Sequence, residues 1–353
     1  MSVRRLIPIL WFTLALALAL GGVSLVLSLL GRRPDVTIGA ILGGAFGSEF
    51  GLTETLLRLV PILLCALAAA IPAESGQFNI GGEGQLHLGA IGAVAGAMLG
   101  SGHPPAIALS LMVAGAIIAG AAWGAIPAGL RAGLGINEAL ISLFLNYVAI
   151  HFLQYLVHGP WKDPASLGWP MSPTLPEILW LKPLGSSRLH AGVFVVVGLA
   201  IGLIWLIQLT RLGFELRAVG RSPRTSTTVH IPVRSYLFGS MVLGGALAGV
   251  AGFYEIAAVQ HRLRPEISPG FGYSGFLVAW MCRGRLWLLL PFSLLVAGLV
   301  SSTENLQITT GLPSATAEIA QGLLLLLILL GTPVVSRLER RQAIRRALEA
   351  ASE

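Results

Sequence analysis

Residues 76–85 have the sequence GQFNIGGEGQ, and they lie between two apolar runs, 56–72 and 85–101. Four polar side chains interrupt what would otherwise be apolar sequence: Gln77, Asn79, Glu83 and Gln85. The glycines among them let the backbone leave helical geometry, and non-helical backbone at membrane depth persists only where protein buries it or water lines it. The stretch therefore predicts a helix break inside a membrane protein.

The composition of the whole chain supports a membrane protein. Of its 353 residues, 55% are hydrophobic and 11% are charged, and the mean hydropathy is +0.80. A soluble domain carries more charge than this. Because each span must satisfy its own backbone hydrogen bonds in lipid, we expect an all-α integral membrane protein with about ten transmembrane helices. The expected spans are 7–30, 56–72, 85–101, 104–130, 138–158, 190–209, 236–257, 271–282, 286–302 and 317–335.

The distribution of positive charge predicts the orientation of these spans. With the N-terminus placed in the cytoplasm, most of the 23 Lys and Arg residues fall in cytoplasmic segments. We therefore expect a transmembrane domain over 1–335, an outer loop at 159–189 and a basic cytoplasmic tail at 336–353. Membrane loops explain the net charge of +7, and the absence of a basic patch interleaved with aromatic residues argues against nucleic acid as a partner.

A second interruption, PEISPGFGYSGF at 265–276, also lies between apolar runs and precedes a short span. In the expected orientation, helices 2–5 and 7–10 would form an inverted repeat with a broken segment at matching positions. Such pairs of interrupted segments indicate a translocation pathway in transporters. Runs of Gly and Ala at 89–100 and 244–252 indicate close helix packing.

The polar side chains of the first interruption are candidates for a solute pathway. Amides donate and accept hydrogen bonds, which suits neutral solutes that carry hydroxyl groups or heterocycles. Glu83 is costly in a membrane unless it is paired or hydrated, so it marks either a functional site or a charge that complements a helix N-terminus. Asn146 either lines the pathway or ties helices together. The pathway candidates are Gln77, Asn79, Glu83, Gln85 and Asn146.

The cytoplasmic loop 211–235 predicts a short helical elbow that docks on another protein. Residues 212–219 can form two helical turns, Gly220 suits the position after a helix end, and Ser222 with Pro223 resembles an N-cap followed by a first helical residue. The alternative is a charged loop that merely follows the positive-inside distribution.

Sequence features of an enzyme are missing. The two lysines, Lys162 and Lys182, belong to no GK[ST] phosphate-binding motif, and neither HExxH nor a nucleophile elbow occurs. Cys65 and Cys282 lie in apolar runs without metal-ligand spacing, so we expect packing residues. An ion-coupled secondary transporter is the alternative to an ATP-driven one, although no chain of intramembrane Asp, Glu and His suggests a proton relay.

Several blocks, in the same order, resemble the ATP-binding-cassette (ABC) importer permeases of the branched-chain amino acid and simple-sugar superfamily, in particular the nucleoside and simple-sugar branch. They are GQFNIGGEGQLHLGA (76–90), GINEALISLFLNYVAIHF (135–152), GPWKDP (159–164), LGFELRAVGRSPR (212–224), GGALAGVAGFYEI (244–256), HRLRPEISPGFGYSGFLVAW (261–280) and IAQGLLLLLILL (319–330). Members of this branch often have an arginine ahead of the first block. Here Pro72-Ala73-Glu74-Ser75 reverses the local charge.

The resemblance implies a permease subunit in a bacterial cytoplasmic membrane, working by alternating access and binding no cofactor of its own. ATP would be bound by a separate ABC ATPase. The other partners implied are an external solute-binding protein and a second, shorter permease. The elbow would then be the coupling helix, with these candidates: Phe214, Glu215, Arg217, Gly220, Arg221 and Pro223.

Overall fold

The computed structural model describes residues 43–185, 187–282 and 284–310, together with isolated positions nearer the two ends of the chain. The chain divides into two compact units, one comprising Met1–Thr55 with Gly298–Glu353 and the other Leu56–Ala297. Apart from those isolated positions, the predicted spans 7–30 and 317–335 and the tail 336–353 lie outside the described residues.

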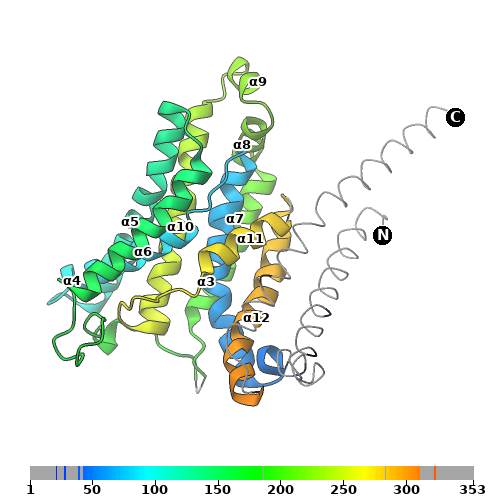
Figure 1. Ribbon diagram of the computed structural model, residues 1–353. Helices are drawn as coiled ribbons and strands as arrows, with labels where there is room; N and C mark the ends of the chain where they lie inside the picture. Colours follow the sequence, from blue (N-terminus) through cyan, green and yellow to red (C-terminus); the bar gives the residue numbers. More distant parts are fainter. Residues whose placement is uncertain are drawn as a thin grey trace. The chain divides into compact units, whose positions relative to one another are not determined.

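The described part of the chain is helical and contains no strand (Figure 1). This confirms the all-α prediction, and each predicted span between 56 and 302 coincides with a helix. In chain order the elements are α3 (Glu49–Glu74), α4 (Gly82–Leu99), α5 (Pro105–Leu134), α6 (Glu138–His158), η1 (Glu177–Leu179), α7 (Ala191–Leu209), α8 (Arg211–Arg221), α9 (Pro223–Thr228), α10 (Val233–Tyr254), the π-helix η2 (Glu255–Gln260), α11 (Phe271–Cys282), η3 (Leu286–Leu288) and α12 (Leu289–Thr310).

Five helical segments of the described residues are long and apolar enough to cross a membrane. They are α3, α5, α6, α7 and the continuous stretch Val233–Gln260 that joins α10 to η2. Helix α11 is short, as its sequence predicts, and α4 has 18 residues. The full set of ten spans and the inverted repeat stay predictions.

Helices α4, α5 and α10 form the close-packed centre of the second unit. A Cβ atom added to Gly89 of α4 would lie 2.3 Å from the Cα of Gly249 in α10. One added to Gly92 would lie 2.3 Å from the carbonyl oxygen of Gly115 in α5. Both distances are far below a normal carbon contact, so only glycine allows these backbones to approach. The close packing predicted from the Gly and Ala runs is confirmed.

The loop 159–189, which the charge distribution predicts to lie outside and which we call the outer loop, is fastened to the chain that follows α10. The Leu175 amide donates to the carbonyl of His261 at 2.9 Å, and the Leu181 amide donates to Ala257 at 2.8 Å. The Trp180 ring stacks on the His261 ring, with centroids 3.8 Å apart. These contacts fasten the proline-rich loop to the end of the π-helix.

Within the first unit, a hydroxyl network joins α3 to the last part of α12. Thr55 Oγ1 donates to the carbonyl of Ala45 at 2.9 Å and lies 2.7 Å from Ser301 Oγ. A Cβ atom on Gly298 would lie 2.7 Å from the Phe46 ring, so the two segments pack tightly there.

Candidate functional site

The helix break comprises residues 75–81 and is shorter than the sequence predicts, because α3 ends at Glu74 and α4 begins at Gly82 rather than at residue 85. Glu83 and Gln85 therefore lie in the first turn of a helix. Between Gln77 and Ile80 the side chains alternate: Gln77 and Asn79 are buried, Phe78 is exposed and Ile80 is half-buried. The segment thus turns its amides toward protein and its apolar side chains outward.

Asn79 and Gln85 form a reciprocal amide pair across the break. Asn79 Nδ2 donates to Gln85 Oε1, and Gln85 Nε2 donates back to Asn79 Oδ1, both at 3.0 Å. Asn79 also donates to the carbonyl of Ala68 in α3 at 3.0 Å and accepts from the Gly81 amide at 3.1 Å. Both side chains are about 1% exposed. The pair fixes where α3 ends and α4 begins, and it leaves few polar atoms for a solute.

Gln77 and its neighbour Ser75 tie the beginning of the break to α10. Gln77 Nε2 donates to the carbonyl of Leu237 at 2.8 Å and to Ser240 Oγ at 3.3 Å. Ser75 Oγ lies 3.2 Å from the same Ser240 hydroxyl. A movement of α10 would therefore act directly on the break.

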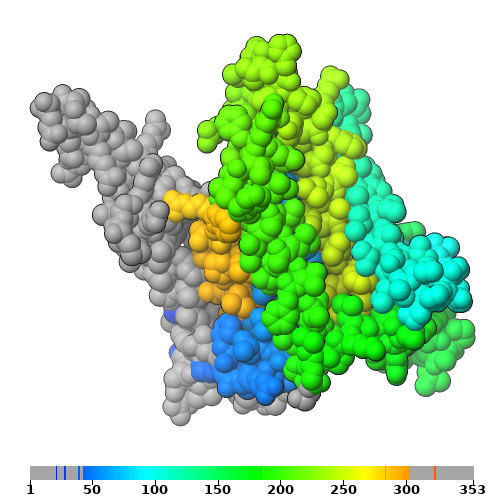
Figure 2. Space-filling model, turned by 180° about the vertical axis from the view of Figure 1, so that it is seen from behind, coloured from blue at the N-terminus to red at the C-terminus, as the bar shows by residue number. Residues whose placement is uncertain are grey.

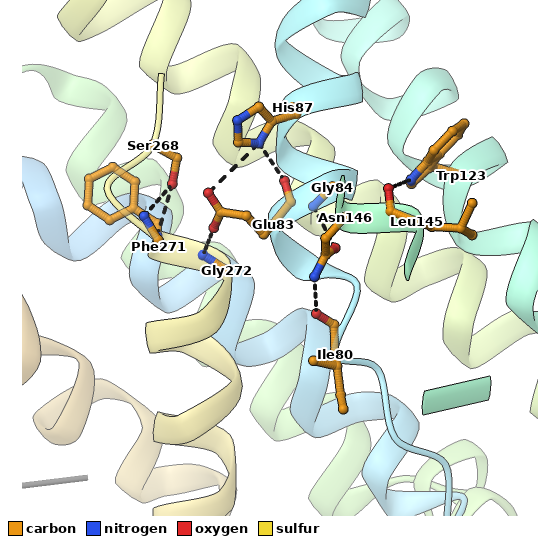
Figure 3. A network of polar contacts seen from close by, with 11 residues as sticks. Ile80, Glu83, Gly84, His87, Trp123, Leu145, Asn146, Ser268, Phe271 and Gly272 are labelled. Atoms are coloured by element: carbon orange, nitrogen blue, oxygen red, sulfur yellow. Dashed lines mark hydrogen bonds and ion pairs between the residues drawn. The ribbon is translucent and has the colours of Figure 1, made fainter. Parts of the chain in front are cut away.

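Asn146 of α6 completes the start of α4 (Figure 3). Its Oδ1 accepts from the Gly84 amide at 2.8 Å, and its Nδ2 donates to the carbonyl of Ile80 at 3.0 Å. The Gly84 amide is one of the first-turn groups that a helix cannot satisfy internally. These two bonds tie α6 to the break and to the start of α4, and a pathway role for Asn146 stays a prediction.

Glu83 joins the break to the second interrupted segment (Figure 3). One carboxylate oxygen accepts from the Gly272 amide at 2.7 Å, in the first turn of α11. Ser268 Oγ accepts from the Phe271 amide at 2.9 Å and caps the same helix. A carboxylate at this helix N-terminus is favoured by the helix dipole. The other carboxylate oxygen lies 3.8 Å from His87 Nδ1, which in turn lies 2.8 Å from the Glu83 carbonyl.

The two interrupted segments are in backbone contact at this point. A Cβ atom on Gly272 would lie 2.1 Å from the Glu83 nitrogen. The sequence predicts two breaks at matching positions in the chain; the structure places them against each other. The five pathway candidates consequently form one connected region with α6, α10 and α11.

The coupling candidates belong to α8, except Pro223, which begins α9 (Pro223–Thr228). Gly220 faces the break: a Cβ atom added there would lie 2.3 Å from the Glu74 carbonyl and 3.0 Å from the Gly76 nitrogen. Gly76 itself has a φ of +77°, which favours glycine. Arg217 Nη1 donates to the Ile207 carbonyl at 2.7 Å and lies 3.9 Å from the Glu74 carboxylate.

The predicted position of Gly220 after a helix end is therefore wrong. Helix α8 continues to Arg221, so Gly220 is a helical residue. Because Gly220 has no side chain, residues 74–76 at the end of α3 can pack directly against it. The prediction for the next two residues is confirmed: Ser222 Oγ accepts from the Thr225 amide at 3.3 Å, and Pro223 is the first residue of α9. In both whole-molecule views α9 lies at one end of the second unit (Figure 2).

The outward face of the elbow is available to a partner. Phe214 is 64% exposed, and Arg221 and Pro223 are also exposed. Glu215 accepts from Arg211 Nε at 2.6 Å and from the Tyr236 hydroxyl of α10. The Tyr236 hydrogen bond, followed by the Arg211 contact, lowers the pKa of Glu215 below its ordinary value. Through these two hydrogen bonds Glu215 braces α8 against α10.

Residues that the sequence argument left out also belong to this region. The Glu74 carboxylate lies 3.9 Å from Arg217 Nη1, and Ser240 Oγ accepts a hydrogen bond from Gln77 Nε2. The Phe78 amide donates to Glu138 Oε1 at 3.1 Å. The reversed charge at 72–75 could have identified Glu74 from the sequence. No local sequence feature distinguishes Ser240 from other serines. Among the described residues no group of His, Cys, Asp and Glu could hold a metal ion, and Cys65 and Cys282 are buried and free.

A bundle of apolar helices, two of which follow non-helical segments and contact each other through their first turns, is typical of a polytopic membrane transporter. Residues 51–330 match the family model described as the branched-chain amino acid transport system permease component. The chain belongs to this family of ABC transporter permeases.

Characterised relatives match over most of their length. A glucose ABC transporter permease of Haloferax volcanii is 36% identical over 90% of this chain and 85% of its own. A guanosine ABC transporter permease of Bacillus subtilis is 31% identical over 92% and 94%. A nucleoside ABC transporter permease of Lactococcus lactis is 30% identical over 74% and 75%.

Membership of the family identifies the biochemical role of the chain. It is the membrane-spanning permease subunit of an importer and not an enzyme, and ATP hydrolysis is done by a separate ATPase. These relatives do not support the alternative of an ion-coupled secondary transporter.

Proposed function

We propose that this chain is one of two permease subunits that together import nucleosides or simple sugars across a bacterial cytoplasmic membrane. The solute is delivered by an external binding protein and crosses between the permeases, while both termini stay in the cytoplasm. Relatives named for guanosine, nucleoside and glucose transport support this range of solutes.

The observation that carries the mechanism is the contact between Gly220 of α8 and residues 74–76. We infer that Phe214, Arg221 and Pro223 contact the ATPase, and that Arg217 and Gly220 pass its movement to the break. Gln77 then transmits this movement to α10, and Glu83 transmits it to α11. The five pathway candidates then act by setting the shape of the pathway wall.

The test is uptake by the complete importer in proteoliposomes, with a panel of radiolabelled nucleosides and simple sugars. We expect ATP-dependent uptake of at least one class, abolished when the ATPase partner carries a substitution that prevents hydrolysis. Uptake that persists with the inactive ATPase would contradict the proposal.

A further inference from the structure

Two exposed aromatic rings, one from the break and one from α11, stack on each other. Phe78 belongs to the break and Trp280 to α11; their ring centroids are 5.3 Å apart and their planes differ by 12°. Phe78 is 42% exposed and Trp280 is 39% exposed. The nearby Phe276 ring lies 6.1 Å from Trp280 at a tilt of 54°. Together Phe78, Phe276 and Trp280 form the aromatic platform.

The backbone that carries Phe78 argues against a lipid-facing position. Residues 77–80 are not helical, and lipid does not tolerate irregular backbone in its hydrocarbon region. The Phe78 amide donates to Glu138, whose other carboxylate oxygen lies 3.4 Å from Arg131 Nη1. The Arg131 side chain is 42% exposed. The Glu138 side chain is itself only 4% exposed, so this pair fastens the Phe78 backbone to the start of α6.

The elements around the platform are those that form the site. Residues 78–80 run along the first turns of α6, because Glu138, Ser142 and Asn146 all bond to their backbone. Tyr147, the next residue of α6, is 55% exposed. On α11, Tyr273, Phe276 and Trp280 recur at helical spacing, and Tyr273 is half-buried. The platform therefore lies where the break, α6 and α11 come together.

We propose that the aromatic platform binds the planar heterocycle of a nucleoside by stacking during translocation. This inference rests on the proposed function and narrows its solute class. The Phe78 and Trp280 rings are near-parallel and partly exposed, and aromatic side chains stack on bases of any sequence.

The experiment compares transport rates in the complete importer, with binding protein and solute both saturating. Trp280→Leu and Phe78→Leu are expected to lower the nucleoside transport rate about tenfold, because one stacking contact corresponds to about that factor. Trp280→Phe and Phe78→Tyr keep a ring, and they should stay within about twofold of the parent. Trp205→Leu is the matched control, since Trp205 is a 54% exposed tryptophan of α7 outside the platform.

A photoactivatable azidopurine nucleoside supplies a second readout. We expect it to label residues 78 and 276–280, with unlabelled nucleoside competing and simple sugars failing to compete. Co-purification with the partner subunits shows whether each variant assembles. Equal slowing by the ring-keeping variants, or labelling confined to other segments, would overturn the inference. ATP-dependent transport of sugars alone would also overturn it, yet leave the importer function intact; no ATP-dependent transport of any solute would overturn that function.

Discussion

At the scale of single residues, the Asn79–Gln85 pair shows how a membrane protein keeps polar groups without exposing them. Each amide is both donor and acceptor, and the two side chains satisfy each other at about 1% exposure. Removing one partner leaves the other buried with unmet hydrogen bonds, which costs more than the pair contributes. The two residues should therefore behave as one unit.

A double-mutant cycle tests this coupling. We expect Asn79→Ala and Gln85→Ala each to lower the free energy of unfolding by about 1–3 kcal/mol. The double variant should lose less free energy of unfolding than the sum of the two single losses. The coupling free energy should be at least about 0.5 kcal/mol. The measurement is denaturant unfolding in detergent, accompanied by uptake in proteoliposomes. Strictly additive losses would show that the pair does not act as a unit.

At the scale of elements, the elbow and the break meet through glycine. Ala is a better helix former than Gly by about 1 kcal/mol, so Gly220→Ala should stabilise α8 by itself. Its Cβ atom, however, would lie 2.3 Å from the Glu74 carbonyl. We therefore expect uptake to fall while ATPase activity continues, because α8 would be pushed away from the break.

The control for this prediction is Gly239→Ala in α10, where an added Cβ atom meets nothing within 4 Å. That variant should transport at the parent rate. The measured quantity is the number of solute molecules imported per ATP hydrolysed. An unchanged ratio in Gly220→Ala would remove the close contact from the coupling mechanism.

The outer loop is an element whose stability should depend on pH. Burial, together with His190 and the positive charges of Arg188 and Arg262, lowers the pKa of His261 below its ordinary value of 6.5. Burial also lowers the pKa of His190. The folded loop thus favours neutral rings, so its stability is full above pH 6.5 and declines as the pH falls below that value.

Hydrogen exchange measures this decline. The amides of Leu175 and Leu181, which bond to the segment after α10, should exchange faster at pH 5.5 than at pH 7.5, after correction for intrinsic rates. Replacing both His190 and His261 by Gln should abolish the additional pH dependence. Equal protection of the parent at both pH values would contradict the assignment.

The boundaries of these elements show what sequence alone can reach. The spans follow from apolar length, and the start of α9 follows from Ser222 and Pro223, because both signals are local. The start of α4 does not, since Asn146 caps it from another helix. Gly220 has a local interpretation as a helix terminator, but its contact with Glu74 is set by tertiary packing. The aromatic platform likewise needs the fold that unites Phe78 with Trp280.

At the scale of the whole molecule, orientation decides which partner each surface meets. The elbow can reach an ATPase only if it faces the cytoplasm, and the outer loop can meet a binding protein only from the other side. The positive-inside distribution predicts this arrangement. The chain is well suited to a direct test, because both native cysteines are buried.

Single cysteines at exposed positions provide that test. We expect Thr227→Cys, in α9, to react with a membrane-impermeant maleimide only after intact cells are permeabilised. Ala165→Cys, in the outer loop, should react in intact cells, and the parent chain should react in neither condition because Cys65 and Cys282 are shielded. The opposite pattern would place the elbow outside the cell, where no ATPase could engage it, and the route from Gly220 through the break to α11 would then have no source of movement.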